Sequence, residues 1–130
     1  MTALYTYPYN RSYQPAMPVV EIELGKGGRP EFGKTHEALV DSGADGTLVP
    51  VDILEEIGAR SVGAARIRSV LGESQVADIY LVSLRIGSHL LGAVRVVAGL
   101  EGEEIILGRN VLNQLVVTLN GLASTVEIFA

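Results

Sequence analysis

The sequence of 130 residues has no cysteine, which excludes disulfide bonds and metal sites built on thiolates and leaves the redox compartment undetermined. It also has no apolar run near the ~18 residues that a membrane-spanning helix needs. Its first residues lack the basic and apolar blocks of a signal peptide. We therefore expect no membrane span and take the cytoplasm as the default location.

Positive charge is scarce, because 10 Lys and Arg residues face 15 Asp and Glu residues, for a net charge of −5. Binding to nucleic acid requires clustered positive charge, so this balance argues against nucleic acid as a main partner. Apolar residues (48%) and glycine (15 residues) are abundant, and many of the apolar residues are β-branched. This composition predicts one globular domain of short strands joined by tight turns.

Residues 1–17 differ in composition from the rest of the chain. They hold four of the five tyrosines and two prolines, with little aliphatic periodicity. We interpret them as an extended N-terminal arm that precedes a domain formed by residues 18–130. Two alternatives stay open for the arm: a partly disordered tail, or a segment that packs its tyrosines on this subunit or on a partner.

From residue 19 onward, short segments of alternating apolar and polar residues predict strands. A turn at 71–74 would join a long hairpin, and Asn120-Gly121 predicts a second hairpin with a type I′ turn. A proline, early acidic residues and a final glycine predict a short helix over 50–58, and residues 110–115 could form one or two helical turns. The expected strands cover residues 19–24, 37–40, 65–71, 75–86, 90–97, 104–107, 116–119 and 122–129.

The residue that carries the chemistry is Asp41, which ends an apolar strand and enters the glycine-rich turn 42–46. A carboxylate there would be partly desolvated yet approachable, and a hydroxyl and backbone N–H groups could hold it. Gly43 lets the backbone turn sharply and lets a ligand come close. The tripeptide Asp-Ser-Gly is common, however, and alone it would indicate only a turn or helix-capping acid.

A second motif far downstream, Ile105-Ile106-Leu107-Gly108-Arg109-Asn110, changes this balance. Together with residues 37–47, and with Thr118-Leu119-Asn120 near the C-terminus, it resembles the retropepsin family, the retroviral-type aspartic proteases. The resemblance extends over about residues 18–120, and the order of hairpin, Asp loop, long hairpin, helix and final strand is similar throughout.

The resemblance implies an all-β fold, a closed acid-protease-type barrel with one lobe per chain and one or two short helices. It also implies an endopeptidase that needs neither metal nor cofactor and acts on a peptide or protein substrate. Two carboxylates share one proton in such a site, one as general base and one as general acid. Since this chain has one Asp-Ser-Gly, a second copy would supply the other Asp41, which implies a homodimer.

Roles for single residues follow from the same resemblance. Asp41 is the catalytic acid, and Ser42, Gly43 and Ala44 complete the active-site loop. The Ser42 hydroxyl would bond across the dimer axis, and Gly43 would either bond the carboxylate through its N–H or give access to it. Arg109 would pair with Asp45. The expected substrate-binding residues are Asp45, Gly46 and the hairpin tip or flap, Val70, Leu71, Gly72 and Glu73; the expected supporting residues are Ile106, Leu107, Gly108 and Arg109.

The chain also departs from the family pattern. The flap tip has one glycine and an acidic residue, and a hairpin strand continues past Asn120. Viral dimers interleave both termini, and here the final hairpin could form more of the interface and the arm less. The rival hypothesis from another class is a catalytically silent dimerisation or peptide-binding module with the same fold.

Three other signals are set aside. Residues 28–35 match the phosphate-loop pattern G-x-x-x-x-G-K-[ST], but no helix can follow before Asp41. His36 and His89 lie far apart in sequence, without the three or four ligands of a metal site. The acidic residues at 101–104 are best interpreted as a solvated turn.

Overall fold

The computed structural model describes residues 3–68 and 71–129, which form ten strands and two short helices. The strands are β1 (Leu4–Pro8), β2 (Val19–Lys26), β3 (Thr35–Val40), β4 (Thr47–Pro50), β5 (Arg60–Arg68), β6 (Ser74–Ile86), β7 (His89–Gly99), β8 (Ile105–Leu107), β9 (Val116–Asn120) and β10 (Thr125–Phe129). The helices are α1 (Val51–Glu56) and α2 (Arg109–Leu112). The mainly β prediction is confirmed, and both short helices lie where the sequence places them.

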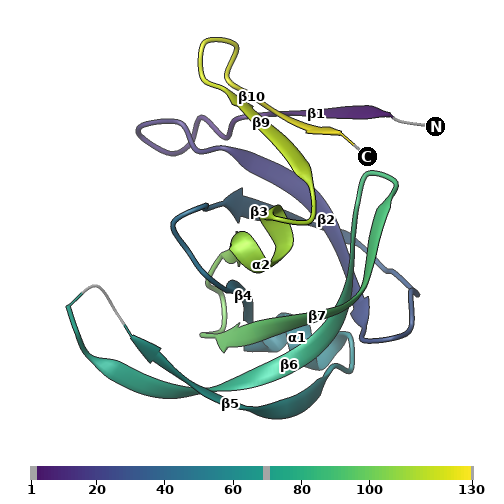
Figure 1. Ribbon diagram of the computed structural model, residues 1–130, viewed down its shortest axis with the longest axis vertical. Coiled ribbons are helices and arrows are strands. Elements are labelled where there is room, and N and C mark those ends of the chain that lie inside the picture. The colour runs from purple at the N-terminus through teal and green to yellow at the C-terminus, as the bar shows by residue number, and fades with distance from the viewer. Residues whose placement is uncertain (1–2, 69–70, 130) are drawn as a thin grey trace.

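The larger sheet closes on itself. Its strand order is β2-β3-β8-β4-β7-β6-β5, and β2 also pairs with β6, so that six strands form a barrel (Figure 1). Strand β5 pairs with β6 outside this closed ring, and the β5–β6 hairpin extends away from it. The closed all-β barrel expected from the resemblance is therefore confirmed.

The interior of the barrel follows from the alternation in the strands. On β2, Val20, Ile22 and Leu24 are each at most 2% exposed, whereas the residues between them face outward or lie at the rim. Helix α1 adds Leu54 to the same core. Burial of each such side chain contributes roughly 1.5–3 kcal/mol.

A second sheet joins the two ends of the chain, with strand order β1-β10-β9 (Figure 1). Leu4 pairs with Phe129 and Pro8 with Thr125, so the N-terminal strand lies along the C-terminal one. Tyr5, Tyr7 and Tyr9 are partly buried against the core. The structure therefore shows the arm packed on its own subunit from Leu4 onward.

The turn between β9 and β10 differs from the sequence prediction. Asn120 pairs with Thr125, so residues 121–124 form the connection, and Ser124 is the residue in it with a left-handed φ of 55°. The Asn120 Oδ1 atom accepts a hydrogen bond from the Ala123 N–H at 3.0 Å. The type I′ prediction is wrong because Asn120 caps a longer turn with its side chain instead of adopting a left-handed conformation itself.

The predicted long hairpin is present as β5 and β6, with Ile67 opposite Gln75 and Arg68 opposite Ser74, so β5 ends before the predicted residue 71 and β6 begins at Ser74. Val70 of the predicted flap lies outside the described residues. Between β2 and β3 the chain runs as a loop without a helix, as expected once the phosphate-loop hypothesis is set aside. In the described chain, no helix has the length and apolar character needed to cross a membrane.

Candidate active site

Asp41 directly follows β3, which runs parallel to β8 with Val40 beside Leu107. The Asp41 N–H extends this pairing by donating to the Leu107 carbonyl at 3.1 Å. The Ala44 N–H then donates back to the Asp41 carbonyl at 3.1 Å and forms the turn. The Gly43 N–H donates to the Asp41 carboxylate at 2.9 Å. Strand pairing thus fixes the backbone of Asp41, and the turn gives its carboxylate a backbone donor.

The surroundings of the carboxylate differ from one sequence-based expectation. Asp41 and Ser42 are both exposed in the single chain, whereas the sequence predicts partial desolvation. The reason is geometric, because β3 ends at the rim of the barrel and carries Asp41 just beyond its buried residues. Water would leave this carboxylate only when another molecule covers the rim.

The turn rests on Gly108, the residue between β8 and α2. A Cβ atom at Gly108 would overlap the backbone of Gly46 and lie 3.0 Å from the Ala44 carbonyl oxygen. The backbone of the Asp41 loop therefore passes directly over a position that tolerates only glycine. Because of this contact, the conformation of the Asp41 loop depends on the glycine of the downstream Leu107-Gly108-Arg109 motif.

Hydrogen bonds centred on the buried Thr47 side chain tie the same two segments together. The Thr47 hydroxyl donates to Asn110 Oδ1 at 2.7 Å and accepts from the Gly108 N–H at 3.1 Å, and Thr47 is only 1% exposed. The Asn110 side chain in turn donates to the Arg95 carbonyl at 2.9 Å. Thr47 and Asn110 are not among the predicted site residues. The sequence feature that could have identified Thr47 is a hydroxyl residue at the start of a short apolar strand.

Arg109 holds the loop by another route than the predicted one. Its backbone N–H donates to the Ala44 carbonyl and its guanidinium to the Ser42 carbonyl, each at 2.8 Å. No ion pair joins Arg109 to Asp45, both of which the structure describes, so that predicted pairing is wrong. The guanidinium instead satisfies a carbonyl that the sharp turn leaves without a backbone partner.

A cavity of about 420 Å³ opens in front of Asp41. The predicted residues Asp41, Gly43–Gly46, Ile106 and Arg109 all line it. Leu107 is fully buried behind the loop, and Ser42, Leu71, Gly72 and Glu73 are not among the lining residues. Besides Thr47, four further lining residues from β4, β5 and β7 were not singled out by the sequence: Leu48, Ile67, Arg68 and Val97.

A family model described as "gag-polyprotein putative aspartyl protease" matches residues 32–114, which include the Asp41 loop, the flap hairpin and α2. The chain belongs to this family. The retropepsin resemblance seen in the sequence is thereby confirmed. No curated protein sequence matches the chain.

Solved structures show the same fold as this aspartyl protease family member. A retropepsin-like aspartic protease from Rickettsia conorii superimposes with a TM-score of 0.69 at 13% identity, covering 99% of this chain and 92% of that one. The EIAV protease with the inhibitor HBY-793 gives 0.60 at 17% identity over 75% and 86% of the two chains. The simian foamy virus (mac) protease gives 0.54 at 23% identity over 73% and 91%.

The candidate active site of this retropepsin-like chain has carboxylates, backbone donors and cations, but its described residues include no cluster of metal ligands. Among residues 3–68 and 71–129, no group of three or more His, Cys, Asp or Glu side chains could hold a metal ion. Arg68 and Arg109 both border the cavity that contains Asp41 and Asp45. The arrangement suits a carboxylate that exchanges protons with a molecule bound in the cavity.

Proposed function

We propose that the chain is an aspartic endopeptidase that acts as a homodimer, with Asp41 of each copy forming the catalytic pair. The observation that carries the proposal is the Asp41 carboxylate itself, held by the Gly43 N–H at the rim of a cavity on a loop that Gly108 and Arg109 support. The family match and the shared retropepsin-like fold support the same reaction class.

Peptide hydrolysis at such a pair needs one ionised and one protonated carboxyl group. The ionised group removes a proton from water as the water oxygen attacks the peptide carbonyl carbon, and the protonated group gives its proton to the carbonyl oxygen. The tetrahedral intermediate then collapses as its C–N bond breaks. The nitrogen takes the proton that the first group removed from water, and the second group, now ionised, takes a proton from a hydroxyl of the intermediate. Two like charges in one site disfavour double ionisation, so the pair titrates as a unit.

A second copy would provide what the single chain lacks, which is a second acid and a cover for Asp41. One Asp-Ser-Gly occurs in the sequence, and both Asp41 and Ser42 are exposed in the single chain. In the proposed dimer the two loops meet at a twofold axis, with the Ser42 hydroxyl bonding to the partner loop. The substrate would lie extended between the loops and the flaps, along Asp45 and Gly46 and beneath the part of the tip at 71–73.

The small sheet offers the edge for this association. Strand β10 lies between β1 and β9 and has both neighbours within the chain, so the outer edges belong to β1 and β9. Strand β9 follows α2 directly, and its Val116 and Leu119 are 64% and 49% exposed. Exposed apolar residues on an edge strand favour pairing with another chain. We propose that β9 forms the core of the dimer sheet.

The main test compares peptide cleavage by the wild type and by Asp41→Asn from about pH 3 to about pH 8, over the range in which a carboxyl pair changes protonation. The amide can still accept the Gly43 N–H, so the fold should persist while turnover falls at least about 10³-fold. Asp78→Asn removes an exposed acid from β6 as the matched control. Equal cleavage by the Asp41 variant, or no cleavage by the wild type, would refute the protease and favour the silent peptide-binding module.

Subunit mixing tests whether two copies of Asp41 share one site. If every active dimer needs both, an equal mixture of wild type and Asp41→Asn retains about one quarter of the wild-type activity after subunit exchange. One half would remain if each chain had a complete site. Analytical ultracentrifugation of Val116→Arg tests the proposed edge, with Leu90→Arg as a control of similar exposure on β7. A dimer that survives Val116→Arg unchanged would contradict the role of β9.

A further inference from the structure

Strand β6 changes partners along one of its edges. Leu81 pairs with Arg60, the first residue of β5, and the next residue, Val82, pairs with Lys26, the last residue of β2. The end of β2 and the start of β5 therefore meet beside two consecutive residues of β6. We call this junction the β6 seam. Because it lies at the start of β5, it is at the opposite end of that strand from Arg68 and the Asp41 cavity.

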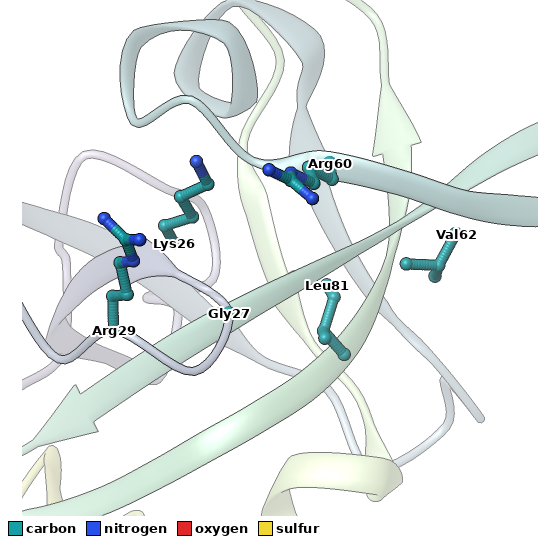
Figure 2. Close-up of a pocket in the computed structure, with 6 residues that line it drawn as sticks. All are labelled: Lys26, Gly27, Arg29, Arg60, Val62 and Leu81. Atoms are coloured by element: carbon teal, nitrogen blue, oxygen red, sulfur yellow. The ribbon is translucent and has the colours of Figure 1, made fainter.

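A cavity of about 380 Å³ opens at the β6 seam, a volume typical of small-molecule sites. Three of its lining residues are cations, Lys26, Arg29 and Arg60 (Figure 2). In this view the Arg60 guanidinium extends toward Lys26, while Arg29 lies on the other side of Lys26. Val62 and Leu81 add an apolar wall. The cavity is therefore cationic on one side and apolar on the other.

The loop that presents two of these cations is held in place. The Ser83 hydroxyl, which is fully buried, lies 3.0 Å from both the Lys26 and the Arg29 carbonyl oxygens. A Cβ at Gly25 would lie 2.7 Å from the Glu31 carbonyl oxygen, and one at Gly27 would lie 2.7 Å from Leu81 Cγ. Glycine at both positions lets the loop fold tightly against β6. The backbone that carries Lys26 and Arg29 is thus preorganised.

These cations form no ion pair within the described chain. Its two ion pairs are Lys34–Glu56 and Arg85–Glu23, so Lys26, Arg29 and Arg60 take part in neither. Three of the chain's 10 Lys and Arg residues thus surround one cavity in a protein with a net charge of −5. Like charges around a shared cavity repel one another, and a bound anion would relieve that repulsion.

We propose that the cavity at the β6 seam binds a phosphate monoester whose organic part contacts Val62 and Leu81. A phosphate group carries nearly two negative charges and several acceptor oxygens on one centre, which suits three cations around one cavity. Carboxylates on an extended peptide would instead alternate between its two faces. Side chains supply the charge, so the site differs from the helix-linked phosphate loop that the pattern at 28–35 suggested. The proposal does not depend on protease activity.

The test is an NMR titration of the full chain with phenyl phosphate and, separately, with inorganic phosphate at constant ionic strength. We expect saturable shifts of the Gly27, Arg60 and Leu81 amides, with little change at Gly43. Because the phenyl group would contact the apolar wall, phenyl phosphate should bind several-fold more tightly than inorganic phosphate. Shifts without saturation, or saturable binding of a tetraglutamate peptide but of neither phosphate, would overturn the proposal.

Substitutions test whether phenyl phosphate binds in this cavity or is only attracted by positive charge on the protein surface. Arg60→Gln and Lys26→Gln should each weaken phenyl phosphate about tenfold, the effect of losing a hydrogen bond to a charged group. Arg11→Gln makes the same charge change at an exposed turn outside the cavity and should weaken it less than about twofold. Arg60→Lys keeps the charge, so it should bind more tightly than Arg60→Gln. An equal loss in Arg11→Gln and Arg60→Gln, with well-dispersed spectra for both, would refute the site.

Discussion

The Asp41 loop and the flap hairpin border the same cavity, but they are held in different ways. The loop receives hydrogen bonds from the backbone N–H and the guanidinium of Arg109, and Thr47, which follows it, accepts from the Gly108 N–H and donates to Asn110 Oδ1. On the flap side, seven of the nine residues of β5 are exposed, and the side-chain bond across the hairpin joins Arg66 to Ser74 at 3.2 Å. One wall of the cavity is anchored to the core, and the other is held mainly by its strand ladder.

This difference matches what the proposed reaction needs from each wall. Catalytic carboxylates must keep their geometry, which requires support by packed residues behind them. A cover over an extended substrate must open and close, and segments with few buried contacts open at low free-energy cost. Four sets of variants test whether the Asp41 loop and its supports contribute more to the free energy of unfolding than the flap hairpin does.

The largest effect is expected for Gly108→Ala. The new methyl group would overlap the Gly46 backbone, which cannot move without displacing the Asp41 loop. We expect a loss of roughly 2–3 kcal/mol in the free energy of unfolding, measured by urea denaturation. Gly92→Ala on β7 is the control, because nothing lies within 4 Å of the position that its new methyl group would take. Equal stability of the two variants would show that the loop does not depend on this contact.

The next effect concerns the hydroxyl of Thr47. Thr47→Val keeps the shape of the side chain but leaves the Gly108 N–H and Asn110 Oδ1 without their partner. A buried group that loses its hydrogen bond costs about 1–3 kcal/mol, so we expect a loss of about 2 kcal/mol in unfolding. Thr35→Val at the start of β3, where the side chain is exposed, should change stability by less than about 0.5 kcal/mol. A smaller loss in Thr47→Val than in Thr35→Val would contradict the role of the Thr47 hydroxyl.

The anchored wall also shows how far sequence reasoning reaches. Asp41 and the Leu107-Gly108-Arg109 motif could be found because each is a short, local pattern. The partner of Arg109 could not, because it is a backbone carbonyl whose direction depends on the turn. The role of Thr47 depends on how closely Gly108 approaches the loop, which no spacing reveals.

The same limit applies to the fold. Alternation and turn residues predicted most strands and the flap hairpin, because those signals are local. The pairing of β1 with β10 joins the two ends of the chain, and no local pattern in residues 4–8 indicates that partner. Deleting residues 122–130, a direct test of the final hairpin in the dimer, would also remove the fully buried Val126 and Ile128. A point substitution at Val116 is therefore the cleaner experiment.

A comparison of two arginines, one in the barrel and one in the flap hairpin, extends the contrast to smaller changes in the free energy of unfolding. Arg85 in the barrel forms an ion pair with Glu23 at 2.8 Å and lies 4.6 Å from the centre of the Phe32 ring. Arg85→Ala should cost about 1 kcal/mol in unfolding. Arg66→Ala in the flap should cost less than about 0.5 kcal/mol, because its one side-chain bond to Ser74 is exposed. A larger cost at Arg66, measured by urea denaturation, would show that the flap is held by more than its ladder.

The smallest effect lies on β3, the strand that delivers Asp41. Burial lowers the pKa of His36 below its ordinary value, the Lys34 cation lowers it further, and Glu56 opposes both. The unfolded chain therefore binds a proton near pH ~6.5 that the folded chain binds less readily, so stability falls as the pH drops from ~6.5 toward the lower folded pKa and levels off below it. His36→Gln should flatten that part of the stability profile, measured by urea denaturation at several pH values, with His89→Gln as the control for losing a histidine elsewhere. If the two variants changed the profile equally, the decline would belong to the whole chain and not to the strand behind Asp41.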